Sequence, residues 1–451
     1  MTPLTLDDAL KVARETRSLD IGQSILGSVP RVFQQHFAQQ QAVVIADKYS
    51  MPAAGKAIVE AFQSSGQPLL KPFVFADDDL YAEHRFVERL EAFFREHAAV
   101  PVAVGSGTIN DLVKLAAHRT GRQYVCVATA ASMDGYTAYG ASITWQGSKQ
   151  TFDCPAPIAV VADLDVIARA PEEMRAWGYA DLLAKVTAGA DWILADIVGV
   201  EPINRVSWDI VQGGLRDAVA APALVRSGNP TALGKLVKGL MLSGFAMQAM
   251  RSSRPASGAE HQFSHLWDME HHTHQGKAPS HGQKVGIGTL AVTALYERIL
   301  ATSDAPFDPE EAVRRWPARE QWHELARTLF EDPNLQKVAV QETMAKLPQR
   351  DELRRQLIQL HERWSEMQLR LREQLIPFNK LRSMLHAVGA PVDGSAIGID
   401  KPRLRGSFQK ALMIRRRFTV LDLTVRIGMF DKYVDELFST VDGGQLAEPF
   451  I

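Results

Sequence analysis

The chain has 451 residues, of which 46% are hydrophobic and 23% charged, and its formal net charge at pH 7 is -2. These values are typical of a globular protein of two or three domains, and they exclude a disordered or fibrous chain. The near-neutral balance gives no electrostatic reason to expect nucleic acid or an anionic membrane surface as a partner. The two cysteines lie in no metal-ligand spacing, which favours a reducing, cytoplasmic location. The sequence shows no secretory signal and no apolar run of about 18 residues, so we expect no membrane span.

The first 175 residues predict a parallel α/β domain. Short apolar runs at 41–47, 70–77 and 100–104 alternate with segments of helical spacing, and further runs begin near residues 124 and 156. This alternation implies a parallel sheet covered by helices, as in Rossmann-like folds. We therefore expect a dinucleotide-binding α/β domain over residues 1–175.

A sharp turn, Gly105-Ser106-Gly107, follows the third run, and a helix with Thr108 as its cap is expected over 108–118. The backbone N–H groups of such a turn and helix N-terminus suit a pyrophosphate. The third glycine of the dinucleotide fingerprint is absent, so by itself the turn fits a plain tight turn as well.

From about residue 176 the pattern becomes helical throughout, which predicts an all-helical domain over 176–451. A helix is expected from Pro171 to residue 196. It carries Asp181 and Lys185 four residues apart, either as a surface ion pair or with Asp181 as a paired or metal-bound carboxylate in an apolar face. Apolar residues at alternating spacings of four and three predict one long amphipathic helix over 351–376, packed within this domain rather than in a coiled coil.

Six of the thirteen histidines lie between residues 258 and 288, at positions 261, 265, 271, 272, 274 and 281. Imidazole is the commonest neutral metal ligand and titrates near physiological pH. His261 and His265 share one face of a predicted helix, and His281 precedes the start of another. Together with Asp181, His261 and His281 would give three protein ligands and leave a position open for water or substrate. Each histidine taken alone is more often structural or exposed.

Five segments carry a resemblance to a known family. They are GSGTIND (105–111), TAASMDG (129–135), GYADLLAK (178–185), SGAEHQFSH (257–265) and HGQKVGIG (281–288). In this order they resemble sn-glycerol-1-phosphate dehydrogenases, which belong with the iron-containing alcohol dehydrogenases and dehydroquinate synthases. The resemblance runs from about Asp20 to residue 300. It implies a dehydroquinate synthase-like fold, a homodimer, and reversible reduction of dihydroxyacetone phosphate to sn-glycerol 1-phosphate. NADH or NADPH and one divalent ion (zinc, nickel or iron) are the implied cofactors.

The resemblance also implies roles for individual residues. The implied metal ligands are Asp181, His261 and His281, and the implied catalytic and substrate-binding residues are Asp134 and His265. The implied cofactor residues are Asp47 on the adenosine side, Gly105, Ser106, Gly107, Thr108 and Ile109 in the pyrophosphate loop, and Thr129, Ala130, Ala131 and Ser132 in a further lining segment. The chain departs from the family twice. Ala138 stands where a serine is usual, and the additional His271, His272 and His274 are either exposed or include an alternate ligand.

Three other functions remain open at this point. The first is a metal-dependent glycerol or polyol dehydrogenase of the same superfamily, which would not need the substrate phosphate. The second is a dehydroquinate synthase-like cyclase, which would consume no NADH. The third is a metal- or nucleotide-binding regulatory relative that has lost turnover. The sequence does not choose between NAD and NADP, among the metals, or between pathways.

Overall fold

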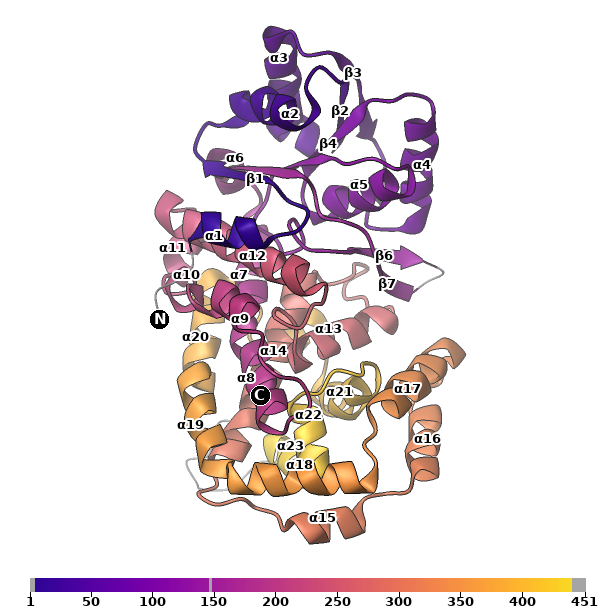
Figure 1. Cartoon of the computed structure of the whole chain (residues 1–451), viewed down its shortest axis with the longest axis vertical. Helices are drawn as coiled ribbons and strands as arrows, with labels where there is room; N and C mark the ends of the chain where they lie inside the picture. The colour runs from indigo at the N-terminus through magenta and orange to yellow at the C-terminus, as the bar shows by residue number, and fades with distance from the viewer. Residues whose placement is uncertain (1–4, 146–147, 440–451) are drawn as a thin grey trace. The chain divides into compact units, whose positions relative to one another are not determined.

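The computed structural model describes residues 5–145 and 148–439, which form two compact units (Figure 1). Unit 1 takes its described residues from Met1–Leu183, Val206–Ala256 and Ala387–Gly389. Unit 2 takes its described residues from Ala184–Arg205, Ser257–His386 and Ala390–Ile451. The units are built from interleaved stretches of chain. The expected boundary between a dinucleotide-binding domain (1–175) and a helical domain (176–451) stays a prediction.

Unit 1 contains a six-stranded parallel sheet, with strand order β1-β8-β5-β4-β2-β3. Its strands are β1 (Ser18–Gly22), β2 (Ala42–Asp47), β3 (Leu69–Phe75), β4 (Val100–Gly105), β5 (Val125–Ala128) and β8 (Ala159–Asp163). The predicted parallel sheet is thereby confirmed. From β2 the chain moves outward to β3 and then returns to β4 on the other side of β2. The strand order therefore reverses between β2 and β4, which makes this point a topological switch.

Helices cover both faces of the sheet in unit 1 (Figure 1). Successive strand residues point to opposite faces, so Val44 and Val102 pack with Phe33 and Phe62 of α2 (Val29–Phe37) and α3 (Lys56–Ser65). The β2-to-β3 and β4-to-β5 connections run in opposite directions. Because such crossovers are right-handed, α5 (Gly107–Arg119) lies on the face opposite to α3, together with α4 (His84–Arg95).

The other elements of unit 1 include a hairpin that the sequence pattern did not predict. The antiparallel strands β6 (Ala141–Trp145) and β7 (Ser148–Phe152) form a separate two-stranded sheet next to α5. The remaining elements are α1 (Leu6–Val12), η1 (Leu26–Ser28), η2 (Met51–Gly55), α6 (Leu164–Arg169), α7 (Glu172–Leu183), α9 (Arg205–Gln212), α10 (Leu215–Ala218), α11 (Pro222–Arg226) and α12 (Pro230–Met250).

The regular elements in the described part of unit 2 are helices, joined by turns and loops, as predicted for the second half of the chain. It begins with α8 (Lys185–Ile197), α13 (Ala259–Met269) and α14 (His281–Leu300). The later elements are α15 (Pro309–Arg315), α16 (Arg319–Thr328), α17 (Pro333–Lys346), α18 (Arg350–Glu362), α19 (Trp364–Gln374), α20 (Phe378–Val388), η3 (Gly394–Ile397), α21 (Lys401–Met413), α22 (Val420–Arg426) and α23 (Phe430–Phe438). Among the described helices of the whole chain, none has the length and apolar character needed to cross a membrane.

Two helices that the sequence predicts as continuous are interrupted. The one expected from residue 171 to residue 196 divides into α7 and α8 at Ala184, and the one expected over 351–376 divides into α18 and α19 at Arg363. The backbone of Arg363 leaves the helical region, with φ -102° and ψ 16°. Its guanidinium donates to the carbonyl of Ile197 at 3.1 Å. The prediction of single helices was wrong in both places, and at Arg363 the spacing of apolar residues does not reveal this tertiary contact.

Candidate functional site

The ends of three neighbouring strands in unit 1 hold the predicted cofactor residues. β2 ends at Asp47, β4 ends at Gly105, and Thr129 follows the last residue of β5. In a parallel sheet these carboxyl ends lie at the same edge, and ligands of open α/β sheets bind there at the switch point. The sheet topology therefore brings together residues that are up to 82 positions apart in the sequence (from 47 to 129).

The carboxylate of Asp47 is held in a turn at the end of β2. Its Oδ1 accepts hydrogen bonds from the backbone N–H groups of Tyr49 (2.8 Å) and Ser50 (2.7 Å). The hydroxyl of Ser50 in turn accepts from the N–H of Asp47 at 2.9 Å. An acid fixed beyond the second strand is the arrangement with which dinucleotide folds contact a ribose hydroxyl.

The glycine turn connects β4 directly to α5. Ser106 occupies the N-cap position, two residues before the predicted cap Thr108, and the helix begins at Gly107. A Cβ at Gly105 would come within 2.6 Å of Ile109, and a Cβ at Gly107 would come within 2.4 Å of the methyl group of Met133. Packing therefore requires Gly105, because the branched side chain of Ile109 lies against it, whereas at Gly107 the flexible end of Met133 would have to move aside. The first N–H groups of α5, at Gly107 and the two residues after it, have no partner within the helix and suit an anion.

The predicted lining segment, Thr129 to Ser132, is buried. The N–H of Thr129 donates to the carbonyl of Gly105 at 3.1 Å, and the hydroxyl of Tyr136 donates to the carbonyl of Ala130 at 2.7 Å. Gly178 of α7 lies so close to this segment that a Cβ there would be 2.0 Å from the carbonyl oxygen of Ala131. The glycine thus permits α7 to approach the segment.

Asp134 is bonded to two other elements of unit 1. Its N–H donates to Oδ2 of Asp181 on α7 at 3.0 Å, and its own Oδ2 accepts from the hydroxyl of Ser243 on α12 at 2.7 Å. Asp181 is fully buried, which excludes the surface ion pair considered for it. The sequence analysis missed Ser243, although a small polar residue in the apolar segment 240–247 was an available signal.

Three of the predicted histidines lie together in unit 2. His261 and His265 are one turn apart on α13, and His281 is the first residue of α14, where a capping box formed by Ser280 and Gln283 starts the helix. The ring centroids of His261 and His281 are 5.3 Å apart, and each lies 6.4 Å from that of His265. The three histidines that the resemblance assigns to the metal and the substrate are thus neighbours in space.

The rings of His261 and His281 are oriented through their Nδ1 atoms. Nδ1 of His261 lies 2.7 Å from Oε1 of Glu260, and Nδ1 of His281 lies 3.3 Å from the hydroxyl of Ser264. Metal-binding histidines are commonly held in this way, with Nδ1 bonded to an outer partner and Nε2 directed to the ion. The chemistry of this pair therefore fits a metal site.

Glu260 is the outer partner that the sequence analysis did not identify. It is fully buried, and its carboxylate also accepts from the N–H of Gly258 (2.6 Å) and the hydroxyl of Thr187 (2.9 Å). Burial raises the pKa of Glu260, but the hydrogen bond from His261 and the backbone bonds outweigh it, so the pKa lies below its usual value. The group is a carboxylate at neutral pH, and Nδ1 of His261 consequently carries the proton.

A second buried acid, Asp191, fixes the start of α13. Its Oδ2 accepts from the N–H of Ala259 at 2.6 Å, and its Oδ1 accepts from the hydroxyl of Tyr296 (2.6 Å) and the N–H of Val420 (2.8 Å). A Cβ at Gly258 would come within 2.4 Å of Oδ2. Through these contacts Asp191 of α8 links α14 and α22 to the first turn of α13, the helix that carries His261 and His265.

The three additional histidines have other surroundings. His271 is exposed, and His274 lies against Gly398. Nε2 of His272 is 2.6 Å from the carbonyl of Ile397, and its Nδ1 is 2.7 Å from the guanidinium of Arg403. Burial lowers the pKa of His272. Because both of its ring nitrogens are engaged, His272 has a structural role.

Ala138, where the resemblance led us to expect a serine, is buried beside Met247 and Ala256. The adjacent Thr137 donates its hydroxyl to the carbonyl of Met241 at 2.8 Å. The threonine hydroxyl is therefore engaged in the protein core and does not replace the serine.

Comparison with known proteins shows the family of the chain. A family model described as iron-containing alcohol dehydrogenase matches residues 20–171. The chain is 32% identical over 296 residues to the glycerol-1-phosphate dehydrogenase [NAD(P)+] of Bacillus licheniformis, covering 65% of this chain and 74% of that protein. The chain belongs to the glycerol-1-phosphate dehydrogenase family. Other members of this family are the Pyrococcus abyssi protein, 31% identical over 62% of this chain and 78% of that one, and the Geobacillus thermodenitrificans protein, 27% identical over 92% and 96%.

Solved structures place this family member in the fold of the iron-containing alcohol dehydrogenases and dehydroquinate synthases. Glycerol dehydrogenase from Schizosaccharomyces pombe matches with a TM-score of 0.59 and 17% identity, covering 93% of this chain and 90% of that one. A probable glycerol dehydrogenase from Sinorhizobium meliloti matches with a TM-score of 0.58 and 16% identity, covering 93% and 98%. At these identities the likeness shows the fold alone.

Proposed function

We propose that this protein reduces dihydroxyacetone phosphate reversibly to sn-glycerol 1-phosphate, with NADH or NADPH and one divalent metal ion. The observation that carries the proposal is the pair of imidazoles His261 and His281, held through Nδ1 in the manner of metal ligands. They occur in a chain that belongs to the glycerol-1-phosphate dehydrogenase family and has a parallel sheet with a glycine turn at its switch point.

For the metal we propose Asp181, His261 and His281 as ligands. Each offers one ligand atom, a carboxylate oxygen or a ring nitrogen. A carboxylate with two imidazoles suits zinc, nickel or iron and leaves positions open for substrate. The support for Asp181 is its complete burial, which an acid tolerates only with strong partners.

For the dinucleotide we propose the switch-point edge of the unit 1 sheet. The N–H groups of Gly107, Thr108 and Ile109 would hold the pyrophosphate, and Asp47 would contact the adenosine ribose. The buried small residues 129–132 would lie along the cofactor, since small side chains permit close approach of a flat ring to the backbone.

In the reaction, the bound divalent ion supplies a Lewis acid for the ketone oxygen and the dinucleotide supplies the hydride. Asp134 accepts a hydrogen bond from the free hydroxyl of the substrate and thereby orients the ketone. His265 gives the proton to the oxygen at C2 during reduction and takes it back during oxidation. The two residues together would fix which face of the ketone faces the dinucleotide.

The decisive experiment combines metal analysis with an NADH and NADPH oxidation assay. Dihydroxyacetone phosphate is compared with dihydroxyacetone, before and after removal of the metal by a chelator. We expect metal-dependent turnover of the phosphorylated ketone. Turnover of only the unphosphorylated ketone would instead identify a glycerol dehydrogenase, and tight nucleotide binding without turnover would identify a regulatory relative.

We further infer a cytoplasmic homodimer that acts on a small molecule and does not bind nucleic acid. The support for the location is the cysteine usage, and the support for the dimer is the family resemblance. Sedimentation of the purified protein at several concentrations tests the oligomeric state.

A further inference from the structure

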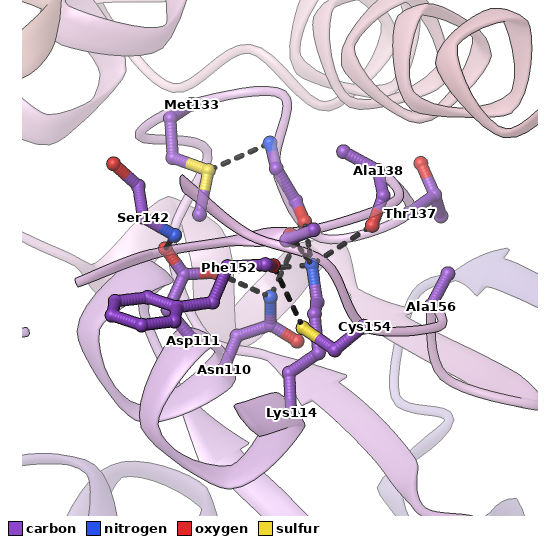
Figure 2. Close-up of polar contacts among 12 residues, drawn as sticks. Asn110, Asp111, Lys114, Met133, Thr137, Ala138, Ser142, Phe152, Cys154 and Ala156 are labelled. Carbon is purple, nitrogen blue, oxygen red and sulfur yellow. Dashed lines mark hydrogen bonds and ion pairs between the residues drawn. The ribbon is translucent and has the colours of Figure 1, made fainter. Parts of the chain in front are cut away.

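Lys114 of α5 is a buried cation that none of the proposed roles uses. The residue is only 1% exposed, and its ammonium group donates to the carbonyls of Gly135 (2.8 Å), Ala138 (2.9 Å) and Gly140 (3.0 Å), as Figure 2 shows. A lysine ammonium has three donors and no acceptor. All three donors therefore bind the backbone of one short segment, residues 135–140.

Two neighbouring side chains of α5 hold the same region. Nδ2 of Asn110 donates to the carbonyl of Gly135 at 3.3 Å, and Oδ2 of Asp111 accepts from the N–H of Ser142 at 3.3 Å (Figure 2). Oδ1 of Asp111 lies 3.8 Å from the ammonium of Lys114. The buried cation thus has a nearby anion as well as three acceptors, which offsets the cost of burying its charge.

Met133 makes the corresponding contact on the other side of Asp134. Its sulfur accepts from the N–H of Gly135 at 2.7 Å, and its methyl group fills the space that a Cβ at Gly107 would occupy. Both neighbours of Asp134 therefore contact α5: Met133 packs on the glycine turn, and the carbonyl of Gly135 accepts a hydrogen bond from Lys114.

Position along α5 connects these contacts with the cofactor. Gly107 begins the helix, and Lys114 lies seven residues further along it, or about 10 Å at the rise of an α-helix. A helix of this length is rigid on the scale of the contacts involved. The position of the loop 133–140 is consequently set relative to the glycine turn.

We propose that Lys114 is a positioning residue, which holds the loop carrying Asp134 in register with the dinucleotide turn through three backbone carbonyls. This inference rests on the proposed role of Asp134 in binding substrate. Lys114 is buried and its three donors are all engaged by carbonyls of the loop, so in this proposal it acts on the reaction only through the loop.

The test compares Lys114→Met with His118→Ala, a control at an exposed position on the same helix. Methionine retains most of the side-chain volume and removes the three donors. We expect kcat/KM for dihydroxyacetone phosphate to fall about 10- to 100-fold, since a displacement of about 1 Å in a substrate-orienting group has effects of this size. The Kd for NADH should change less than about threefold, and the control should match the wild type.

A double-mutant cycle with Asp134→Ala separates positioning from general damage. If Lys114 acts through Asp134, then Lys114→Met should lower kcat/KM by less than about threefold in the Asp134→Ala background. Fully additive losses would overturn the inference while leaving the proposed function intact. If Lys114→Met does not fold, Lys114→Gln, which keeps two donors, takes its place in the cycle.

Hydrogen exchange gives a readout that does not depend on activity. In Lys114→Met the amides of residues 134–140 should exchange at least about tenfold faster, whereas those of β2 and β3 should be unchanged. Unchanged exchange in the loop would overturn the inference. A wild-type protein inactive on dihydroxyacetone phosphate, with faster loop exchange in the variant, would refute the proposed function but not the role of Lys114 in holding the loop.

Discussion

The proposed cofactor residues of unit 1 and the proposed metal residues of unit 2 depend on different kinds of group. The first set consists of strand ends, a glycine turn and backbone N–H groups. A side chain at Gly105 would clash with Ile109, and one at Gly107 would displace the end of Met133. The second consists of imidazoles whose orientation comes from buried side chains, above all Glu260. Cofactor binding in unit 1 should therefore be sensitive to larger side chains at the glycine turn. Metal binding by the residues of unit 2 should be sensitive to the chemical identity of the histidines and their partners.

The largest effect is expected from removing a proposed metal ligand. His261→Ala should lower kcat on the order of 1000-fold, because a Lewis acid contributes several kcal/mol to the stabilisation of the transition state. Metal content per chain, measured by elemental analysis, should fall with it. The control is His271→Ala, which changes an exposed histidine of the same cluster. Equal losses in the two variants would contradict the assignment of ligands in unit 2.

A smaller effect is expected from the outer partner. Glu260→Gln should weaken metal affinity about 10- to 100-fold, because it removes the carboxylate that orients His261 while keeping the side-chain volume. Competition with a chelating dye measures the affinity. Glu362→Gln, at an exposed position of α18, is the matched control. Metal affinity within about twofold of the wild type would show that Glu260 serves only the packing of unit 2.

Adding one methyl group to the glycine turn tests unit 1. The new Cβ of Gly107→Ala would meet the methyl group of Met133, which must move aside, and it would stand on the first residue of α5, in the proposed pyrophosphate turn. We expect the Kd for NADH, measured by fluorescence titration, to rise about tenfold, or about 1.4 kcal/mol. Gly27→Ala is the control, since a Cβ there would meet no atom within 4 Å. If the two variants bound NADH equally well, the turn would not be the pyrophosphate site.

The smallest effect is expected at the position where the chain departs from its family. Ala138→Ser places a hydroxyl beside Met247 and Ala256, and burying it should lower the free energy of unfolding by about 1 kcal/mol. Denaturant unfolding measures this change. The KM for NADH should stay within about twofold of the wild type. A marked fall in that KM would show that the missing serine hydroxyl belongs to the cofactor site.

Much of the architecture followed from patterns that are local in the sequence. Continuous β-branched runs such as 42–47 predict buried parallel strands, and spacing alone placed His261 and His265 on one face of a helix. The breaks at Ala184 and Arg363 and the hairpin β6–β7 were missed. At Arg363 the backbone leaves the helical region where its side chain contacts Ile197, although the apolar periodicity continues through the break.

The residues that hold the proposed site in place were the least predictable. Glu260, Asp191, Ser243 and Lys114 are single polar side chains. Nothing in the sequence around Glu260 and Asp191 distinguishes a carboxylate that orients a neighbouring group from one that forms an ordinary ion pair. Their partners lie as many as 229 positions away, from Asp191 to Val420.

By itself the sequence determined the parallel α/β half, the helical half, the family resemblance and the residue types able to bind a dinucleotide and a metal, because these follow from periodicity and from short motifs. Only the tertiary structure decided that Asp47, Gly105 and Thr129 lie at the ends of neighbouring strands, with Thr129 just after β5. It also decided that Nδ1 of His261 is held by Glu260 and that Lys114 bonds to the loop of Asp134. Strand order and buried hydrogen bonds join residues far apart in the chain, and no local pattern records which partners meet.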